Sequence, residues 1–177
     1  MIMIFRYFLL FYFVRGNGID TLEAVGACIP AYQILTISIS WASTQGFSFK
    51  AAQHFSSKEY KNLGLLLNKA IVYNTIIGFI LFITLFFFGS TIFSFFLKSE
   101  DALMKLDTLL KYISVGTPLQ AFQMVNIKYL SCTKEVKPLL LCSLIGLVTQ
   151  VIFLVIFCWF MGLVEEGIGI SFILANI

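Results

Sequence analysis

The residues of this sequence that could contact a polar ligand are amides and hydroxyls inside long apolar runs. A polar side chain in a membrane helix is costly unless it faces protein or water, so its position is informative. Large amides on several different runs are better explained by a water-filled path than by helix packing alone. The candidates for lining such a path are Gln33, Thr36, Ser40, Gln120, Gln123 and Gln150.

The spacing of the hydroxyl groups favours a stripe along one helix. At about 100° per residue, Gln33, Thr36, Ser40, Ser43 and Thr44 fall within about a third of the helix circumference. Small and hydroxylated residues also let membrane helices approach and hydrogen-bond one another. Helix packing therefore remains an alternative for most of the serine and threonine positions.

Enzymatic chemistry has no visible basis in the sequence. The single histidine, His54, belongs to no Ser/His/Asp set, and neither a metal-ligand cluster nor a phosphate-binding loop is present. The four cysteines form no CxxC pair and predict neither a metal site nor a disulfide framework. We therefore expect no enzyme, no cofactor and no bound metal.

The helices that must position these residues are predicted from composition. With 59% hydrophobic residues, 12% charged residues and a mean hydropathy of +0.94, the chain reads as a membrane protein. A span needs about 20 mostly apolar residues. We predict an all-α polytopic membrane helix bundle, a single membrane domain over 1–177, with about five to six transmembrane helices. The expected spans are about 1–14, 24–49, 65–97, 108–130, 138–164 and, in part, 167–177.

The first and last of these runs are short, so we expect the sequence to be truncated at both ends. A signal peptide is the alternative for residues 1–14, but no small-x-small cleavage site follows them. Pro30 and Pro118 lie within predicted spans, where each removes a backbone hydrogen bond and predicts a local bend.

Charge predicts the orientation of the bundle. If the spans alternate, one side carries seven cations against two carboxylates, and the other carries four cations against seven carboxylates. The positive side is predicted to be cytoplasmic. This accounts for the lysines without a partner, and nucleic-acid binding is not expected from connections this short. The cations of the positive side are Lys50, Lys58, Lys61, Lys69, Lys128, Lys134 and Lys137.

The stretch "QHFSSKEYKNLGLLLNKA", residues 53–70, resembles the connection between the second and third spans of multidrug and toxic compound extrusion (MATE) transporters. Eukaryotic members of that family have the same residue types at the same spacing. The matching positions are Gln53, Phe55, Lys58, Tyr60, Leu63, Gly64 and Leu67.

Further stretches match the family in order and distance. They lie at the start of the second span, in the fourth span and the connection after it, and at the start of the sixth span. The matching positions are Gly18, Leu22, Ala24, Val25, Gly116, Pro118, Lys128, Tyr129, Leu130, Pro138, Gly146, Gly167, Ile168 and Gly169.

The resemblance implies twelve spans in two six-helix lobes, of which this chain would be the N-terminal lobe, eukaryotic-like and without its C-terminal partner. Bacterial and archaeal members often place carboxylates in the first and fifth spans. Leu10, Gln150 and Leu154 stand at the matching positions, so that proton pocket is not retained. The coupling carboxylates would then belong to the missing lobe.

The function implied is part of a secondary active antiporter that exports organic cations or metabolites in exchange for protons or sodium. The partners implied are membrane lipid, a small organic cation, the coupling ion and the C-terminal lobe, in a plasma membrane or a vacuolar-type membrane. A flippase for lipid-linked substrates is one alternative, but the cores of the spans offer no Lys or Arg for a pyrophosphate. A non-transporting membrane fragment is the other.

Overall fold

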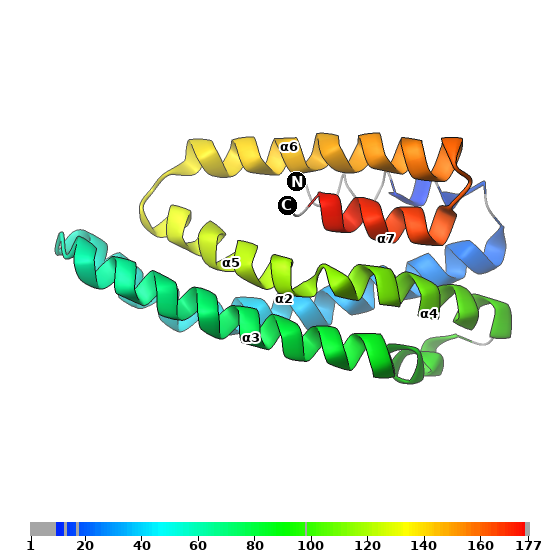
Figure 1. Cartoon of the computed structure of the whole chain (residues 1–177), viewed down its shortest axis with the longest axis horizontal. Helices are drawn as coiled ribbons and strands as arrows, with labels where there is room; N and C mark the ends of the chain where they lie inside the picture. The colour runs from blue at the N-terminus through cyan, green and yellow to red at the C-terminus, as the bar shows by residue number, and fades with distance from the viewer. Residues whose placement is uncertain (1–9, 13, 17, 98, 176–177) are drawn as a thin grey trace.

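The computed structural model describes residues 10–12, 14–16, 18–97 and 99–175 of the chain. Within them the chain is an antiparallel helical bundle without strands, which confirms the predicted all-α class (Figure 1). In chain order the elements are α2 (Ile19–Ser56), α3 (Tyr60–Phe93), the 3-10 turn η1 (Ser94–Phe96), α4 (Glu100–Val115), α5 (Thr117–Cys132), α6 (Val136–Leu154), the π-helical η2 (Val155–Phe160) and α7 (Val164–Leu174).

Among the described residues, three helices are long and apolar enough to cross a membrane. They are Ile19–Ser56, Tyr60–Phe93 and Lys137–Phe160. Large apolar side chains such as Phe87 and Trp159 stay exposed on the bundle, as expected of surfaces that face lipid. The run 1–14 lies mostly outside the described residues, although 10–12 and 14 are helical. Residues 176 and 177 also lie outside them.

The region expected as one run at 108–130 consists of two helices, α4 and α5, which run end to end over 100–132 (Figure 1). Gly116 caps both, and Pro118 follows in the first turn of α5. Because proline has no N–H, Pro118 cannot continue the hydrogen-bond ladder of α4, whereas its place in the first turn of α5 requires no N–H donor. The disruption expected at Pro118 is thus an interruption between two helices.

Helical structure extends into the polar stretch at 53–70 from both ends. Lys50 lies in α2 and Lys69 lies in α3, so only residues 57–59 separate the two helices. Lys58 takes a left-handed conformation with φ of 59°, and the Glu59 N–H bonds to the His54 carbonyl at 2.9 Å. Charged side chains limit an apolar run but not a helix, since lysine and glutamate are good helix formers.

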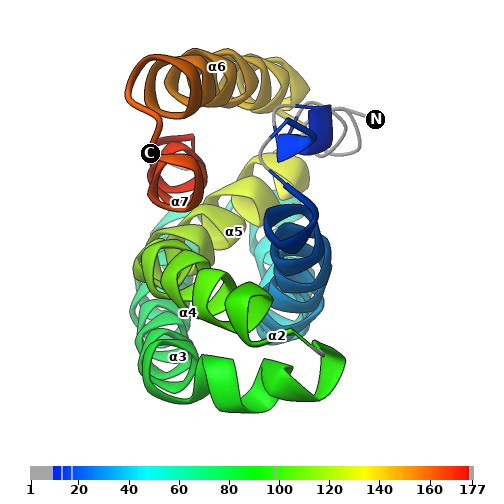
Figure 2. The ribbon, with the colours of Figure 1, turned by 90° about the vertical axis from the view of Figure 1, so that its right-hand side faces the viewer.

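The helices stack in order across the bundle. α2 and α3 pack together, α4 and α5 lie on this pair, α7 covers α4, and α6 lies outermost beside α7 (Figure 2). Leu106, Leu109 and Ile113 of α4 are fully buried at the centre. Gly169 of α7 packs directly on Tyr112 of α4, where an added Cβ would collide with the tyrosine Cβ. Glycine is therefore what lets these helix backbones approach.

Candidate substrate pathway

Buried polar side chains gather where α2, α3 and α5 meet, and we call this cluster the polar seam. The Tyr32 hydroxyl of α2 donates to Gln120 Oε1 of α5 at 2.9 Å and lies 3.3 Å from Thr117 Oγ1. All three side chains are buried. The members of the seam are the buried Tyr32, Thr36, Ser40, Thr44, Asn74, Thr117 and Gln120 and the half-buried Ser43.

The second part of the seam joins α2 to α3. Ser43 Oγ donates to Asn74 Oδ1, and Asn74 Nδ2 donates to the Ala70 carbonyl at 2.9 Å. Thr36 and Thr44 donate to carbonyls of their own helix at 2.8 and 2.9 Å. These donors are satisfied inside the protein, so the seam holds helices together and offers few free groups to a ligand.

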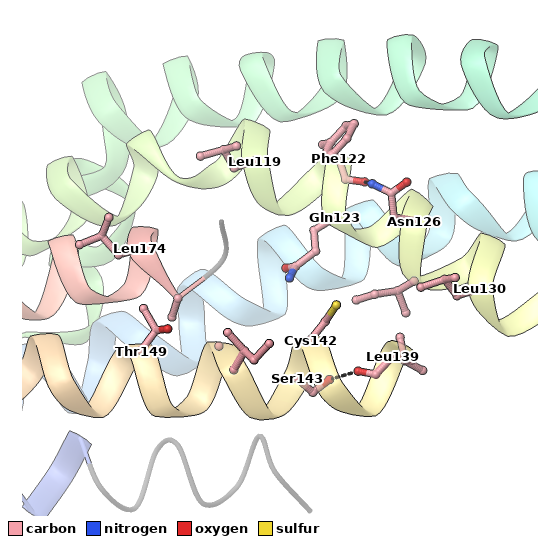
Figure 3. A pocket seen from close by; sticks show the side chains of 14 residues that line it. Leu119, Phe122, Gln123, Asn126, Leu130, Leu139, Cys142, Ser143, Thr149 and Leu174 are labelled. Carbon is pink, nitrogen blue, oxygen red and sulfur yellow. Dashed lines mark hydrogen bonds between the residues drawn. The ribbon is translucent and has the colours of Figure 1, made fainter. Parts of the chain in front are cut away.

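A cavity of about 560 Å³ lies between α5 and α6, bordered by the last turn of α7 (Figure 3). We call it the α5–α6 pocket. α6 is held mainly by α7 and has little contact with α5, which leaves this space open. Its volume lies in the range usual for small-molecule sites. The residues that line it are Leu119, Phe122, Gln123, Asn126, Ile127, Leu130, Leu139, Cys142, Ser143, Ile145, Gly146, Thr149, Leu174 and Ala175.

The lining of the α5–α6 pocket is apolar with a few uncharged polar groups. Gln123 points from α5 toward α6 in Figure 3, and no described residue forms a hydrogen bond with its side chain. Asn126 Nδ2 donates to the Phe122 carbonyl at 3.3 Å, and Ser143 Oγ donates to the Leu139 carbonyl at 2.9 Å. The Gln123 amide is thus available to a ligand as donor and acceptor.

The structure divides the predicted pathway residues between these two regions. Thr36, Ser40 and Gln120 lie in the polar seam. Gln123, about 60° further round α5 from Gln120, lines the α5–α6 pocket. Two glutamines three residues apart on one helix therefore serve different neighbours.

The remaining two candidates lie outside both regions. Gln33 is half-buried on α2, and Gln150 of α6 is 2% exposed without lining the pocket. Leu10 and Leu154, the other positions matched to coupling carboxylates, are buried in one apolar core cluster. These two leucines offer no titratable group to a proton or sodium ion.

Sequence reasoning missed three residues of the seam: Tyr32, Asn74 and Thr117. Asn74 lies within the uncharged run 70–97, and its amide was a signal that the sequence did contain. Tyr32 counts as an apolar aromatic until its hydroxyl is seen to face Gln120. Partners 88 residues apart in the chain cannot be paired from spacing alone.

A charged cluster joins three helices at the end of the bundle opposite the α2–α3 turn. Lys105 Nζ of α4 donates to Thr21 Oγ1 of α2 at 2.6 Å and lies 3.8 Å from Glu165 Oε1 of α7. Thr21 is 1% exposed. The cluster fixes the ends of α2, α4 and α7 relative to one another. In the described part of the chain, no three His, Cys, Asp or Glu residues lie close enough to hold a metal ion.

The chain matches a family model described as MatE over residues 1–156. No curated protein matches the sequence. The fold is similar to the outward-facing conformation of a multidrug resistance MATE family transporter of the MOP superfamily, with a TM-score of 0.90, 16% identity, and coverage of 99% of this chain and 39% of that chain.

Two further solved structures show the same likeness. The inward-facing conformation of a multidrug resistance MATE family transporter matches with a TM-score of 0.88 and 17% identity, covering 97% of this chain and 39% of that one. A MOP superfamily transporter from Pyrococcus furiosus, whose reverse pocket polarity is described as suggesting a different function, matches with a TM-score of 0.89 and 16% identity. That match covers 99% of this chain and 38% of the transporter. At these identities the likeness concerns the fold, and the chain spans about two fifths of each transporter.

Proposed function

Because the chain belongs to the MatE family, we propose that it forms one lobe of a secondary active antiporter that exports organic cations or metabolites. The family is one of membrane transporters, and the fold is that of a lobe of such a transporter. The exchanged ion in this proposal is a proton or sodium, and the second lobe completes the substrate cleft. The proposed location of the transporter is a plasma membrane or a vacuolar-type membrane.

The observation that carries the proposal is the near-equal likeness to outward-facing and inward-facing transporters, with TM-scores of 0.90 and 0.88. A lobe whose fold suits both states is able to move as a rigid body. Alternating access by rocking of one lobe against another requires this property. The polar seam and the Lys105 cluster supply contacts that would keep the lobe rigid during such motion.

The α5–α6 pocket supports a substrate that is amphipathic and of moderate size. Its apolar wall would cover a planar or aliphatic body, and Gln123 would fix the orientation through its amide. Among the described lining residues none is charged, so an anionic substrate has no cation there to bind. A lipid-linked pyrophosphate, as a flippase would carry, therefore has no counter-charge in this lining.

The coupling site in this proposal belongs to the second lobe. Leu10 and Leu154 fill their positions with an apolar core, which supports a coupling carboxylate elsewhere in the transporter. The proposal therefore assigns substrate contacts to this lobe and ion coupling to its partner.

Flux of a fluorescent organic cation tests the proposal. Membrane vesicles that carry the protein from its full reading frame should move the cation when a pH or sodium gradient is imposed. Vesicles with the 177 residues alone should show none, because half of the cleft is missing. Absence of gradient-dependent flux from the full reading frame would overturn the antiporter and favour a non-transporting assembly role.

A further inference from the structure

An open groove of about 470 Å³ runs between α2 and α3 toward the end that charge predicts to be cytoplasmic. It shares no lining residue with the α5–α6 pocket. Lys50 of α2 and Lys69 of α3 lie on its two sides, and both are exposed. Ser43 and Asn74, which are joined by a hydrogen bond, also line the groove. Each lysine lies at least one helical turn nearer the α2–α3 turn than this hydrogen bond does.

The two lysines of the groove are not neutralised by the described residues. Neither forms an ion pair with a described carboxylate, and no Asp or Glu lines the groove. Glu59, at the nearby turn, is already bonded to His54 at 2.8 Å and to Asn62 at 3.0 Å. The groove therefore holds two cations with no local counter-charge.

An apolar track continues from the lysines toward the middle of α3. Lys69, Tyr73, Ile76 and Ile80 follow one another at three- and four-residue steps, which places them on one face of the helix. Tyr73, Ile76 and Ile80 are 60%, 53% and 58% exposed. A ligand that fits this surface has an anionic head and a long apolar body.

We infer that the groove between α2 and α3 binds an anionic phospholipid, with Lys50 and Lys69 on the phosphate and an acyl chain along Tyr73, Ile76 and Ile80. Lysine binds phosphate as a point charge. Basic pockets between membrane helices on the cytoplasmic side are suited to acidic headgroups, because that leaflet holds the anionic lipids. The inference requires that the chain lies in a membrane with this end on the cytoplasmic side, as the charges predict, and it is independent of the proposed transport.

Lipid retention measured by native mass spectrometry tests the inference. The purified chain would be equilibrated in micelles with equal amounts of phosphatidylglycerol and phosphatidylcholine. We expect preferential retention of phosphatidylglycerol, and a roughly 10- to 30-fold lower preference in the double variant Lys50→Gln/Lys69→Gln. The matched control is Lys134→Gln/Lys137→Gln, which removes two exposed lysines of the same predicted side outside the groove.

A second variant blocks the groove and keeps its charge. An added Cβ at Gly46 meets nothing within 4 Å, so Gly46→Leu extends into the groove without a backbone clash and should lower retention as strongly. Equal loss in the Lys134/Lys137 control would overturn the inference in favour of diffuse surface charge. Unchanged retention in both groove variants would also overturn it. Competition by millimolar inorganic phosphate as effective as that by the lipid would reduce the site to a free-anion site and overturn the acyl-chain assignment.

Discussion

The polar seam and the α5–α6 pocket contain the same residue types on neighbouring helices, yet their hydrogen bonding differs. In the seam, Tyr32 bonds to Gln120 and Ser43 bonds to Asn74, so the polar groups face one another across closely packed helices. In the pocket, Gln123 has no such partner among the described residues and faces a cavity. An amide in a membrane helix is thus assigned to packing or to ligand contact by its neighbours.

The difference originates in how closely the helices approach. Gly78 of α3 lies against Pro118 and Ala121 of α5, where an added Cβ would be 2.8 Å from the Pro118 Cα. α6 instead packs on α7, with Gly146 lying against the Ala175 carbonyl, and stands away from α5. Close packing closes the seam, and the displaced helix leaves the pocket.

The largest effect is expected from opening the seam by overpacking. Gly78→Leu would force α3 away from the α5 backbone and should destabilise the bundle by about 1–3 kcal/mol. Thermal unfolding in detergent, followed by loss of the monomeric peak in gel filtration, measures this change. The matched control is Gly64→Ala, where the added Cβ meets nothing within 4 Å. An equal melting temperature for both variants would show that the α3–α5 contact is not close-packed.

A smaller loss is expected from removing one polar partner of the seam. Tyr32→Phe leaves Gln120 without its donor and should cost about 1 kcal/mol. In a double-mutant cycle with Gln120→Leu, the two effects should be clearly less than additive. Tyr112→Phe is the control, since its hydroxyl has no hydrogen bond to a described residue. Additive effects would mean that the Tyr32–Gln120 hydrogen bond contributes no stability.

The pocket should respond in the opposite way. Gln123→Ala removes an amide that no described residue uses, so the melting temperature should stay within about 1 °C. In the flux assay the same variant should raise the KM for the organic cation about fivefold to tenfold, because the substrate loses one hydrogen bond to the protein. Gln33→Ala, outside both regions, should change neither quantity. A strong loss of stability in Gln123→Ala would assign this amide to packing and remove the contrast with the seam.

The smallest effect concerns pH at the α2–α3 turn, away from both regions. Hydrogen bonds from Asn62 and then from His54 lower the pKa of Glu59 below its usual value. A carboxyl with a lowered pKa in the folded state contributes stability above its unfolded pKa, and this is lost as pH falls through the folded pKa. Acidification below about pH 4 should therefore loosen residues 57–59 slightly.

Hydrogen exchange of the amides at 57–59 as a function of pH measures this loosening. Glu59→Gln should remove the pH dependence, because the glutamine does not ionise. The seam and the pocket hold no carboxylate in their described residues, so their exchange should follow only the intrinsic pH dependence of amides. Extra acid sensitivity at the seam would show that the turn and the seam are coupled.

Much of the fold was predictable because the hydrocarbon core imposes local requirements. The expected spans at 24–49, 65–97 and 138–164 fall within or largely overlap the helical segments α2, α3–η1 and α6–η2, since such apolar runs must satisfy their backbone hydrogen bonds internally. The helix ends were not predictable from charge, because lysines such as Lys50 remain helical. The division between α4 and α5 at Gly116 had a signal in Pro118, although a bend within one helix was the expectation.

For the candidate pathway, the sequence by itself determined the inventory: an apolar bundle, its family, and the few amides and hydroxyls able to contact a polar ligand. Only the tertiary structure decided which of these groups are already bonded. Apolar length and backbone hydrogen bonding are local properties that a run of residues carries with it. The partner of a side chain comes from another helix, as Gln120 does for Tyr32 across 88 residues, and Gln123 remains available because α6 packs on α7.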